Sequence, residues 1–410
     1  MSNPKKLMLS RLFGICLFAL LNIDCSSTAN HPQPPTGPGA RFPNISISYD
    51  NSFYLNWFQP DTDGEMGLYF SKFDQGSWSE PSQVVKNQLL FVNWADRPSL
   101  FPLGKNALVV HWLQKENEDD HGYGIRLAIS HDKGNSWIES RRPHPIELGQ
   151  EHGFLSFFFK GDKVGFVWLD SREKTDYDLA THTVLGNMAL FSSYISVNGS
   201  VGKEQIIDHR VCDCCPTAAF SLDGNALIAY RDRAEDETRN ISVMRLTNEE
   251  WSAPEIVHND GWRIPGCPVN GPVMAGHDNS VAVAWFTAPD GEARVNLTFS
   301  NDNGKSFEPP VRIDKGEPIG RPALTWLGND QVAISWVEYS REGVVILLRK
   351  VTKQGDLGKV VSVAFLPGAH GDFFPKMVLN RESLFIVWTD SREEFSIRSK
   401  WLSLDELFLQ

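Results

Sequence analysis

Residues 98–113 read PSLFPLGKNALVVHWL. This is a proline followed by two short apolar runs, and the aromatic residue Trp112 lies near the end of the second run. The turn residues GKN separate the runs, and both runs contain the β-branched and aromatic residues that favour strands. The stretch therefore predicts an antiparallel pair of short strands. Because the second run is apolar at consecutive positions, we expect that strand to be covered on both faces.

The same pattern occurs seven times along the chain. Each copy opens at a Pro or Gly, and an aromatic residue closes its second run 13 to 17 residues later. The openers lie 55, 55, 63, 52, 54 and 53 residues apart. A period near 50 made of short strands is typical of a propeller, in which each small sheet is buried only between its neighbours. The seven pairs are Pro43 with Trp57, Pro98 with Trp112, Gly153 with Trp168, Pro216 with Tyr230, Pro268 with Trp285, Pro322 with Trp336, and Pro375 with Trp388.

Each unit offers four antiparallel strands, which in the second unit are SLFPL, ALVVHWL, IRLAIS and SWIES. The seventh unit offers only three, MVLN, LFIVWT and SIRSKWLSL. We therefore predict an all-β propeller of seven four-stranded blades whose last blade lacks its outer strand. Six blades with one unit diverted elsewhere is the alternative.

The N-terminal residues predict export. Three basic residues precede the apolar run LFGICLFALL, which is too short to span a membrane and fits a signal peptide over residues 1–24. Cys25 follows, at the head of a Pro-rich tether over residues 25–41, and the propeller occupies residues 42–410. The segment resembles a bacterial lipoprotein signal, which implies a lipid anchor on Cys25. The expected location is the periplasm or the cell surface, with membrane attachment through that lipid.

Net charge excludes one class of partner. Without residues 1–24 the chain carries 36 Lys and Arg against 50 Asp and Glu, a formal charge of −14. An acidic surface repels phosphate backbones, so we expect no nucleic-acid partner.

Four cysteines remain in the propeller, Cys212, Cys214, Cys215 and Cys267. An even number in an exported chain predicts disulfides. We expect Cys267 to bond to one of the other three, with Cys212 or Cys215 favoured, and to link blades four and five. A zinc or copper site made of these thiolates is the rival interpretation, and otherwise we expect no cofactor.

Two predicted turns share one pattern. Residues 130–137 read SHDKGNSW and residues 300–307 read SNDNGKSF, both of which fit Ser-x-Asp-x-Gly-x-Ser-aromatic. The Asp can accept backbone N–H bonds within the turn, and the Gly permits a positive φ. The pattern resembles the Asp-box of sialidase-like propellers. Stretches such as FVNWADRPS, RVCDCCPTA and DGWRIPGCPVNGP are similar to bacterial BNR-repeat proteins labelled exo-alpha-sialidase.

The resemblance implies an active site that grips a substrate carboxylate with three arginines and uses a Tyr nucleophile, a Glu and an acidic Asp. Arg263 and Arg321, completed by Arg41 or Arg97, are the candidates for the three arginines. The nucleophile has no counterpart, because Tyr230 and Tyr339 end second strands and no Tyr stands at a late opener.

Antiparallel order places the openers and the ends of the second strands on one face, opposite the Asp-box turns. Arginines and carboxylates gather at those positions, and Arg offers a planar fork that matches a carboxylate in two hydrogen bonds. Structural ion pairs between blades are the alternative, favoured for the Asp-x-Arg motifs at residues 170–172 and 390–392. The candidate catalytic residues are Asp96, Glu151, His152, Asp170 and Asp232, and the candidate substrate-binding residues are Arg97, Arg231, Arg233, Arg263, Asn270 and Arg321.

Two functions follow from these patterns. The first is a sialidase-like propeller that binds an anionic sugar and hydrolyses it as an exo-glycosidase. The second, favoured by the missing Tyr and the tether, is a non-catalytic lipoprotein whose mouth binds a glycan or a protein.

Overall fold

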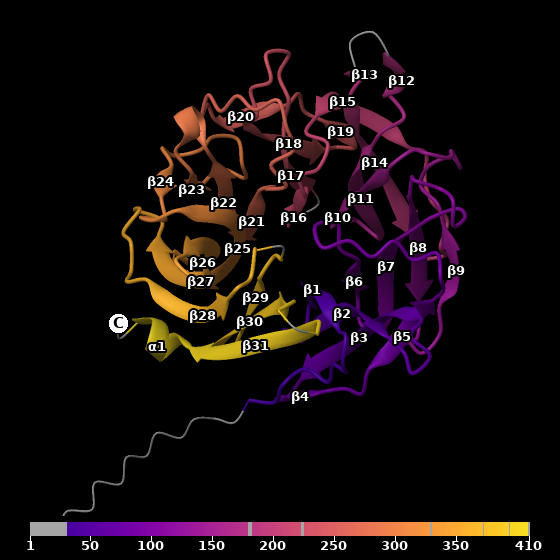
Figure 1. The fold of residues 1–410 in the computed structure, drawn as a ribbon, viewed down its shortest axis with the longest axis horizontal. Helices are drawn as coiled ribbons and strands as arrows, with labels where there is room; N and C mark the ends of the chain where they lie inside the picture. Colours follow the sequence, from indigo (N-terminus) through magenta and orange to yellow (C-terminus); the bar gives the residue numbers. More distant parts are fainter. Residues whose placement is uncertain are drawn as a thin grey trace, which may run out of the picture. The chain divides into compact units, whose positions relative to one another are not determined.

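A computed structural model describes residues 31–408, apart from 179–182, 223–224, 329, 372 and 393. The expected signal peptide, Cys25 and residues 26–30 of the tether lie outside the described residues. Seven antiparallel sheets follow one another around an axis (Figure 1), and β1 (Arg41–Ile47) contacts β29 (Lys376–Asn380) and β30 (Ser383–Asp390), which closes the ring. The predicted all-β, seven-bladed propeller is confirmed.

The innermost strand of each blade lines the axis. These strands are β1, β6 (Ser99–Leu103), β10 (His152–Lys160), β16 (Ala218–Leu222), β21 (Val273–His277), β25 (Pro318–Gly328) and β29. The second strands are β2 (Phe53–Pro60), β7 (Ala107–Gln114), β11 (Lys163–Asp170), β17 (Asn225–Arg231), β22 (Ser280–Thr287), β26 (Gln331–Ser340) and β30.

The third and outer strands complete each blade. The third strands are β3 (Met66–Asp74), β8 (Gly124–Ser130), β14 (Met188–Ser196), β18 (Ile241–Thr247), β23 (Arg294–Ser300), β27 (Gly343–Thr352) and β31 (Ser396–Ser403). The outer strands are β4 (Ser77–Trp78) with β5 (Ser82–Lys86), β9 (Ile138–Arg141), β15 (Gln205–Val211), β19 (Glu250–Trp251) with β20 (Glu255–His258), β24 (Val311–Arg312) and β28 (Val361–Pro367). The seventh blade has three strands, as predicted.

Three short elements lie outside the blade pattern. A hairpin of β12 (Thr175–Asp178) and β13 (Thr183–Leu185) extends blade three between its second and third strands. A 3₁₀ turn, η1 (Pro289–Gly291), joins β22 to β23, and α1 (Leu404–Phe408) follows β31. None of the described helices is long and apolar enough to cross a membrane.

The repeated aromatic residues form the core between blades. Seven apolar clusters each combine residues of two adjacent blades, and each cluster holds one aromatic residue of the repeat. Trp57, for example, packs with Val378 and Phe385 of the last blade, and its side chain is fully buried. Because every blade buries its faces against its neighbours, the core is distributed around the ring.

One opener is displaced from its sequence prediction. The first strand of blade five begins at Val273, so Pro272, and not Pro268, occupies the place that Pro98 and Pro216 occupy before their strands. Pro272 stands 13 residues before Trp285, which brings this unit into line with the others. Cys267 and Pro268 therefore belong to the loop that leads into the blade.

Candidate functional site

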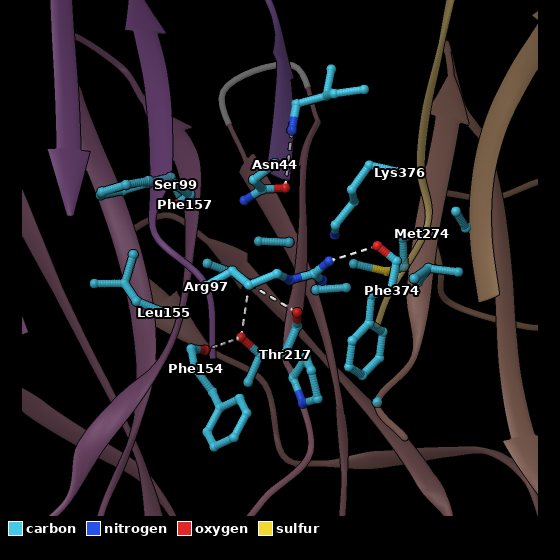
Figure 2. Close-up of a pocket in the computed structure, with 18 of the residues that line it drawn as sticks. Asn44, Arg97, Ser99, Phe154, Leu155, Phe157, Thr217, Met274, Phe374 and Lys376 are labelled. Carbon is cyan, nitrogen blue, oxygen red and sulfur yellow. Dashed lines mark hydrogen bonds between the residues drawn. The ribbon is translucent and has the colours of Figure 1, made fainter. Parts of the chain in front are cut away.

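A cavity of about 330 Å³ lies on the axis, and residues from the first strands of all seven blades line it. Its size is at the lower end of the range typical of small-molecule sites. Two basic side chains reach it, Arg97 from the residues just before β6 and Lys376 from the start of β29. Figure 2 shows Lys376 directed toward the guanidinium of Arg97, which donates from Nη1 to the Phe374 carbonyl oxygen at 3.0 Å.

The surroundings lower the pKa values of both basic groups. Burial, opposed by Asp96 and aided by the nearby Arg321, lowers the pKa of Arg97 to about 9. Burial, followed by the charge of Arg97, lowers the pKa of Lys376 well below its usual value. Asp96 is the one carboxylic acid among the described residues that line the cavity. A bound anion would relieve this repulsion and raise both pKa values.

Asp96 has a second role, in holding the blades together. Its Oδ2 accepts the backbone N–H of Phe154 at 2.8 Å, and Phe154 lies at the start of the next blade with a φ of 53°. The side chain is 2 % exposed, and burial raises the pKa of the carboxyl to about 7. A Cβ on Gly153 would stand 1.9 Å from Asp96 Oδ2, so this approach requires glycine.

The same tie occurs at two other openers. The N–H of Arg321, whose φ is 53°, donates to Asn270 Oδ1 at 2.9 Å. The N–H of Phe42, whose φ is 55°, donates to Thr389 Oγ1 at 2.9 Å. At all three places the register of the first strand pair shifts, so a bulged residue with positive φ is held by a side chain of the preceding blade. Asn270 is thus a structural tie and does not line the cavity.

Arg321 lies beside the cavity and not inside it. Its Nη1 donates to the Val269 carbonyl oxygen, and its guanidinium packs 4.7 Å from the centre of the Trp94 ring and 5.0 Å from that of Phe374. The guanidinium of Arg97 also packs on Phe374, 4.6 Å from the centre of its ring. The structure therefore brings Arg97 and Arg321 together around one aromatic ring.

The remaining arginines of the expected triad are elsewhere. Arg263 is 64 % exposed and pairs with Asp236 at 2.9 Å. Arg41 donates from Nε to the Gly39 carbonyl oxygen and packs 4.1 Å from the Phe395 ring centre. Neither residue lines the axial cavity, so three arginines do not converge there.

His152 and Asp170 form a buried polar cluster between β10 and β11. His152 Nδ1 lies 2.9 Å from Asp170 Oδ2, and the ring stacks on His144 with centres 3.7 Å apart. Asp170 also accepts from Trp168 Nε1 and from Nε and Nη2 of Arg172, and its side chain is fully buried. These bonds lower the pKa of Asp170 against the effect of burial. Arg172 pairs with Asp170 and with Glu204, which belong to the same blade, so this ion pair does not link neighbouring blades as the Asp-x-Arg interpretation expected; Glu151 beside it is exposed.

The arginines after β17 also have protein partners. Arg231 is 1 % exposed and donates to the carbonyl oxygens of Asn270, Arg239 and Phe286. Arg233 pairs with Glu237 at 2.8 Å. Asp232 accepts the Ser242 hydroxyl, and burial raises the pKa of its carboxyl. This group supports the loop between blades four and five.

The cysteines lie in this same loop region. Cys214 and Cys267 are disulfide-bonded with Cα atoms 6.0 Å apart, so the expected link between blades four and five is confirmed. The expectation that Cys212 or Cys215 would be the partner is wrong. Both of those side chains are 1 % exposed and point into the protein, while Cys214 between them turns toward the loop that carries Cys267.

The two Asp-box-like turns have matching geometry. Asp132 Oδ1 accepts the N–H of Ser136 at 2.9 Å, and Gly134 N donates to Ser130 Oγ at 2.8 Å. Asp302 bonds Ser306, and Gly304 bonds Ser300, at the same distances. Both turns follow third strands, far along the strand direction from the openers.

Lys376 is the cavity residue that the sequence analysis missed. It follows the opener Pro375 and begins an otherwise apolar first strand. A basic residue at the first position of an otherwise apolar inner strand is the signal that could have identified it.

No family model matches the sequence, and no curated protein matches it. Among solved structures the chain is similar to the BP39L lectin of Burkholderia pseudomallei, with 12 % identity, a TM-score of 0.63, and coverage of 90 % of this chain and 97 % of the lectin. A PL25 ulvan lyase bound to -[GlcA(1-4)Rha3S]- gives 9 % identity, a TM-score of 0.57, and coverage of 90 % and 95 %. The NanB sialidase of Streptococcus pneumoniae gives 11 % identity, a TM-score of 0.48, and coverage of 92 % and 71 %. The likenesses to the lectin and the lyase show the propeller fold.

Proposed function

We propose that the protein is a glycan-binding propeller that takes an anionic sugar at its axial cavity. The observation that carries the proposal is the pair Arg97 and Lys376, two basic groups in one cavity with depressed pKa values. An anion placed between them gains two charge-assisted contacts in a site shielded from water. The raised pKa of Asp96, about 7, favours its neutral form below neutral pH, where it adds little repulsion.

The solved relatives support a saccharide as the ligand. A lectin and a lyase bound to a GlcA-containing saccharide share this propeller architecture with the chain. A carboxylate or sulfate on a sugar fits the two basic groups, and the apolar and small side chains of the other lining residues fit the sugar faces.

Binding is favoured over hydrolysis. Most glycosidases use two carboxyl groups on either side of the scissile bond. Among the described lining residues only Asp96 carries one, and it is engaged by Phe154. Hydrolysis by a sialidase-type mechanism is the second candidate, supported by the two Asp-box-like turns.

Calorimetric titration with N-acetylneuraminate, glucuronate, galacturonate and a sulfated sugar tests the proposal. We expect at least one acidic sugar to bind and neutral N-acetylglucosamine not to. Arg97→Gln and Lys376→Met should each weaken binding at least tenfold. Lys105→Met, at the exposed β6–β7 turn, is the matched control and should bind normally. Equal affinity in all variants, or no binding of any acidic sugar, would overturn the proposal.

Fluorophore release from the corresponding glycosides separates the two candidates. Turnover that is lost in Arg97→Gln would establish a glycosidase, whereas binding without turnover would establish a lectin-like function.

We also propose that the mature chain is exported and begins at a lipid-modified Cys25. Intact-mass analysis of detergent-extracted protein should give an acylated N-terminus at Cys25. A later, unmodified N-terminus would refute the anchor and leave secretion alone.

A further inference from the structure

The four cysteines of the propeller lie in one cluster at the junction of blades four and five. The Sγ atoms of Cys212, Cys214 and Cys215 lie within 4.8 Å of one another, and Cys214 is bonded to Cys267. Cys212 and Cys215, separated by two residues, are both thiols, with Sγ atoms 3.3 Å apart. A disulfide and a dithiol are thus in contact range.

The two pairs differ in their access to solvent. Cys212 and Cys215 are each 1 % exposed, whereas Cys267 is exposed. Cys267 lies at the edge of a surface hollow of about 350 Å³, whose other lining residues include Asp213, Arg233 and Glu237. A reagent in solution can therefore reach the disulfide but not the dithiol.

The surroundings of Cys212 favour a thiolate, which is the attacking species in disulfide exchange. The Cys212 and Cys215 sulfurs share a hydrogen bond at 3.3 Å, and the positive charge of Arg231 acts on both groups. These interactions lower the pKa of Cys212, while burial and its bond to Cys212 raise the pKa of Cys215.

We propose that these four cysteines form a thiol–disulfide exchange site that passes the electrons of the buried dithiol to the surface. The Cys212 thiolate attacks Cys214 Sγ, which forms a Cys212–Cys214 bond and releases Cys267 as a thiolate. Cys215, after losing its proton to solvent, attacks Cys212 Sγ and releases the Cys214 thiolate. The buried pair is then the disulfide, and the exposed pair carries both thiols.

The exposed thiols can then reduce a disulfide substrate. Cys267 attacks one sulfur of the substrate and expels the first thiolate. Cys214 attacks Cys267 Sγ, which expels the second thiolate and restores the Cys214–Cys267 bond. The net change is reduction of one external disulfide and oxidation of the Cys212–Cys215 dithiol, so no other oxidant or reductant takes part.

Alkylation mapping tests the internal steps. The full chain with Cys16→Ser and Cys25→Ser, which keeps only the four propeller cysteines, is brought to one disulfide and two thiols, checked by intact mass, and incubated with excess maleimide at neutral pH without reductant. Acid-quenched samples are then digested without reduction. For the unsubstituted protein we expect maleimide on Cys214 and Cys267 and a Cys212–Cys215 disulfide.

Two variants give opposite results if the order of steps is correct. Cys215→Ser should stop after the first step, with maleimide on Cys267 and a Cys212–Cys214 bond. Cys212→Ser removes the first attacking group, so its Cys214–Cys267 bond should persist over the same time. The unsubstituted protein supplies the test even if a variant fails to fold.

Substrate reduction is measured with 2-hydroxyethyl disulfide as the probe. The chain with one disulfide should release two thiols per molecule, and Cys212→Ser should release none over the same period. Persistence of the Cys214–Cys267 bond in the unsubstituted protein would overturn the proposal. Stoichiometric zinc or copper held by the four cysteines, with no exchange, would overturn it in favour of a metal site.

Discussion

At the scale of single residues, the openers combine two tasks. Arg97 reaches the axial cavity, while its neighbour Asp96 holds the bulged backbone of the next blade through Phe154 N. Asp96, a candidate catalytic acid, thus accepts a backbone N–H of the next blade, as Asn270 does from Arg321 N. Asn at one site and Asp at the other shows that the tie needs an acceptor oxygen and no charge.

Replacement of Asp96 by Asn should change how stability depends on pH. The folded-state pKa of about 7 lies above the unfolded value near 3.9, so the folded protein holds more protons between these values. Stability should therefore fall as pH rises from about 4 to about 7, by at most ~4 kcal/mol from this group. Asp96→Asn keeps the acceptor and should remove that slope. Urea unfolding across this pH range measures it, and identical slopes in both proteins would contradict the assignment.

Binding of an acidic sugar should take up protons. The anion raises the pKa of Lys376, which burial and Arg97 hold well below its usual value in the free protein. Affinity should therefore decrease as pH rises through the free-state pKa of Lys376. Titration calorimetry in buffers of different ionisation enthalpy reports the uptake. The uptake should shrink in Lys376→Met, and an unchanged buffer dependence in that variant would assign it to another group.

At the scale of elements, each Asp-box-like turn contacts the preceding blade. A Cβ on Gly134 would stand 2.3 Å from Phe70 Cζ, and a Cβ on Gly304 would stand 2.7 Å from Leu227 Cδ2. The turn therefore serves both its own hairpin and the packing between blades. This explains why glycine occupies the same position of the motif in both copies.

Substitution of this glycine should separate the cost of backbone strain from the cost of the clash with the preceding blade. Gly134→Ala meets both a φ of 89° and the ring of Phe70, whereas Gly76→Ala meets a φ of 85° with open space around it. Backbone strain at positive φ should cost each variant about 1–2 kcal/mol, and the clash should add about 1–3 kcal/mol to Gly134→Ala. Denaturant unfolding of the two proteins side by side gives the difference, and equal losses would show that the turn moves away freely.

The strands could be predicted because each strand is indicated by its own residues. The site was harder to predict because its residues come together only in the folded ring. The runs at residues 99–103, 107–114, 124–130 and 138–141 match their sequence prediction closely. Consecutive apolar residues and the turn residues between the runs are enough to place these strands. Lys376, by contrast, gains its role only when ring closure brings the first strand of blade seven near that of blade two, with blade one between them. Cys214 was missed as the partner of Cys267 because the local backbone decides which of three neighbouring cysteines faces outward, and it buries Cys212 and Cys215.

At the scale of the whole molecule, ring closure joins the two ends of the propeller. The last blade lacks an outer strand, and no strand from the N-terminal side of the described chain completes it. Closure instead depends on packing of the first blade against the last around Trp57, and on the bond from Phe42 N to Thr389 Oγ1. This bond joins residues 347 positions apart in the sequence. It is of the same kind as the bonds from Phe154 N to Asp96 and from Arg321 N to Asn270.

Removal of the Thr389 hydroxyl should therefore weaken closure of the ring. Thr389 is 2 % exposed and Phe42 is 8 % exposed, so Thr389→Val leaves a buried N–H without its acceptor while preserving side-chain shape. We expect a loss of about 1–3 kcal/mol in the free energy of unfolding. Thr389→Ser keeps the hydroxyl and is the matched control, expected to lose less. Hydrogen exchange should show the added opening in β1 and β30 first, because these strands form the closure, and uniform exchange around the ring would argue against it.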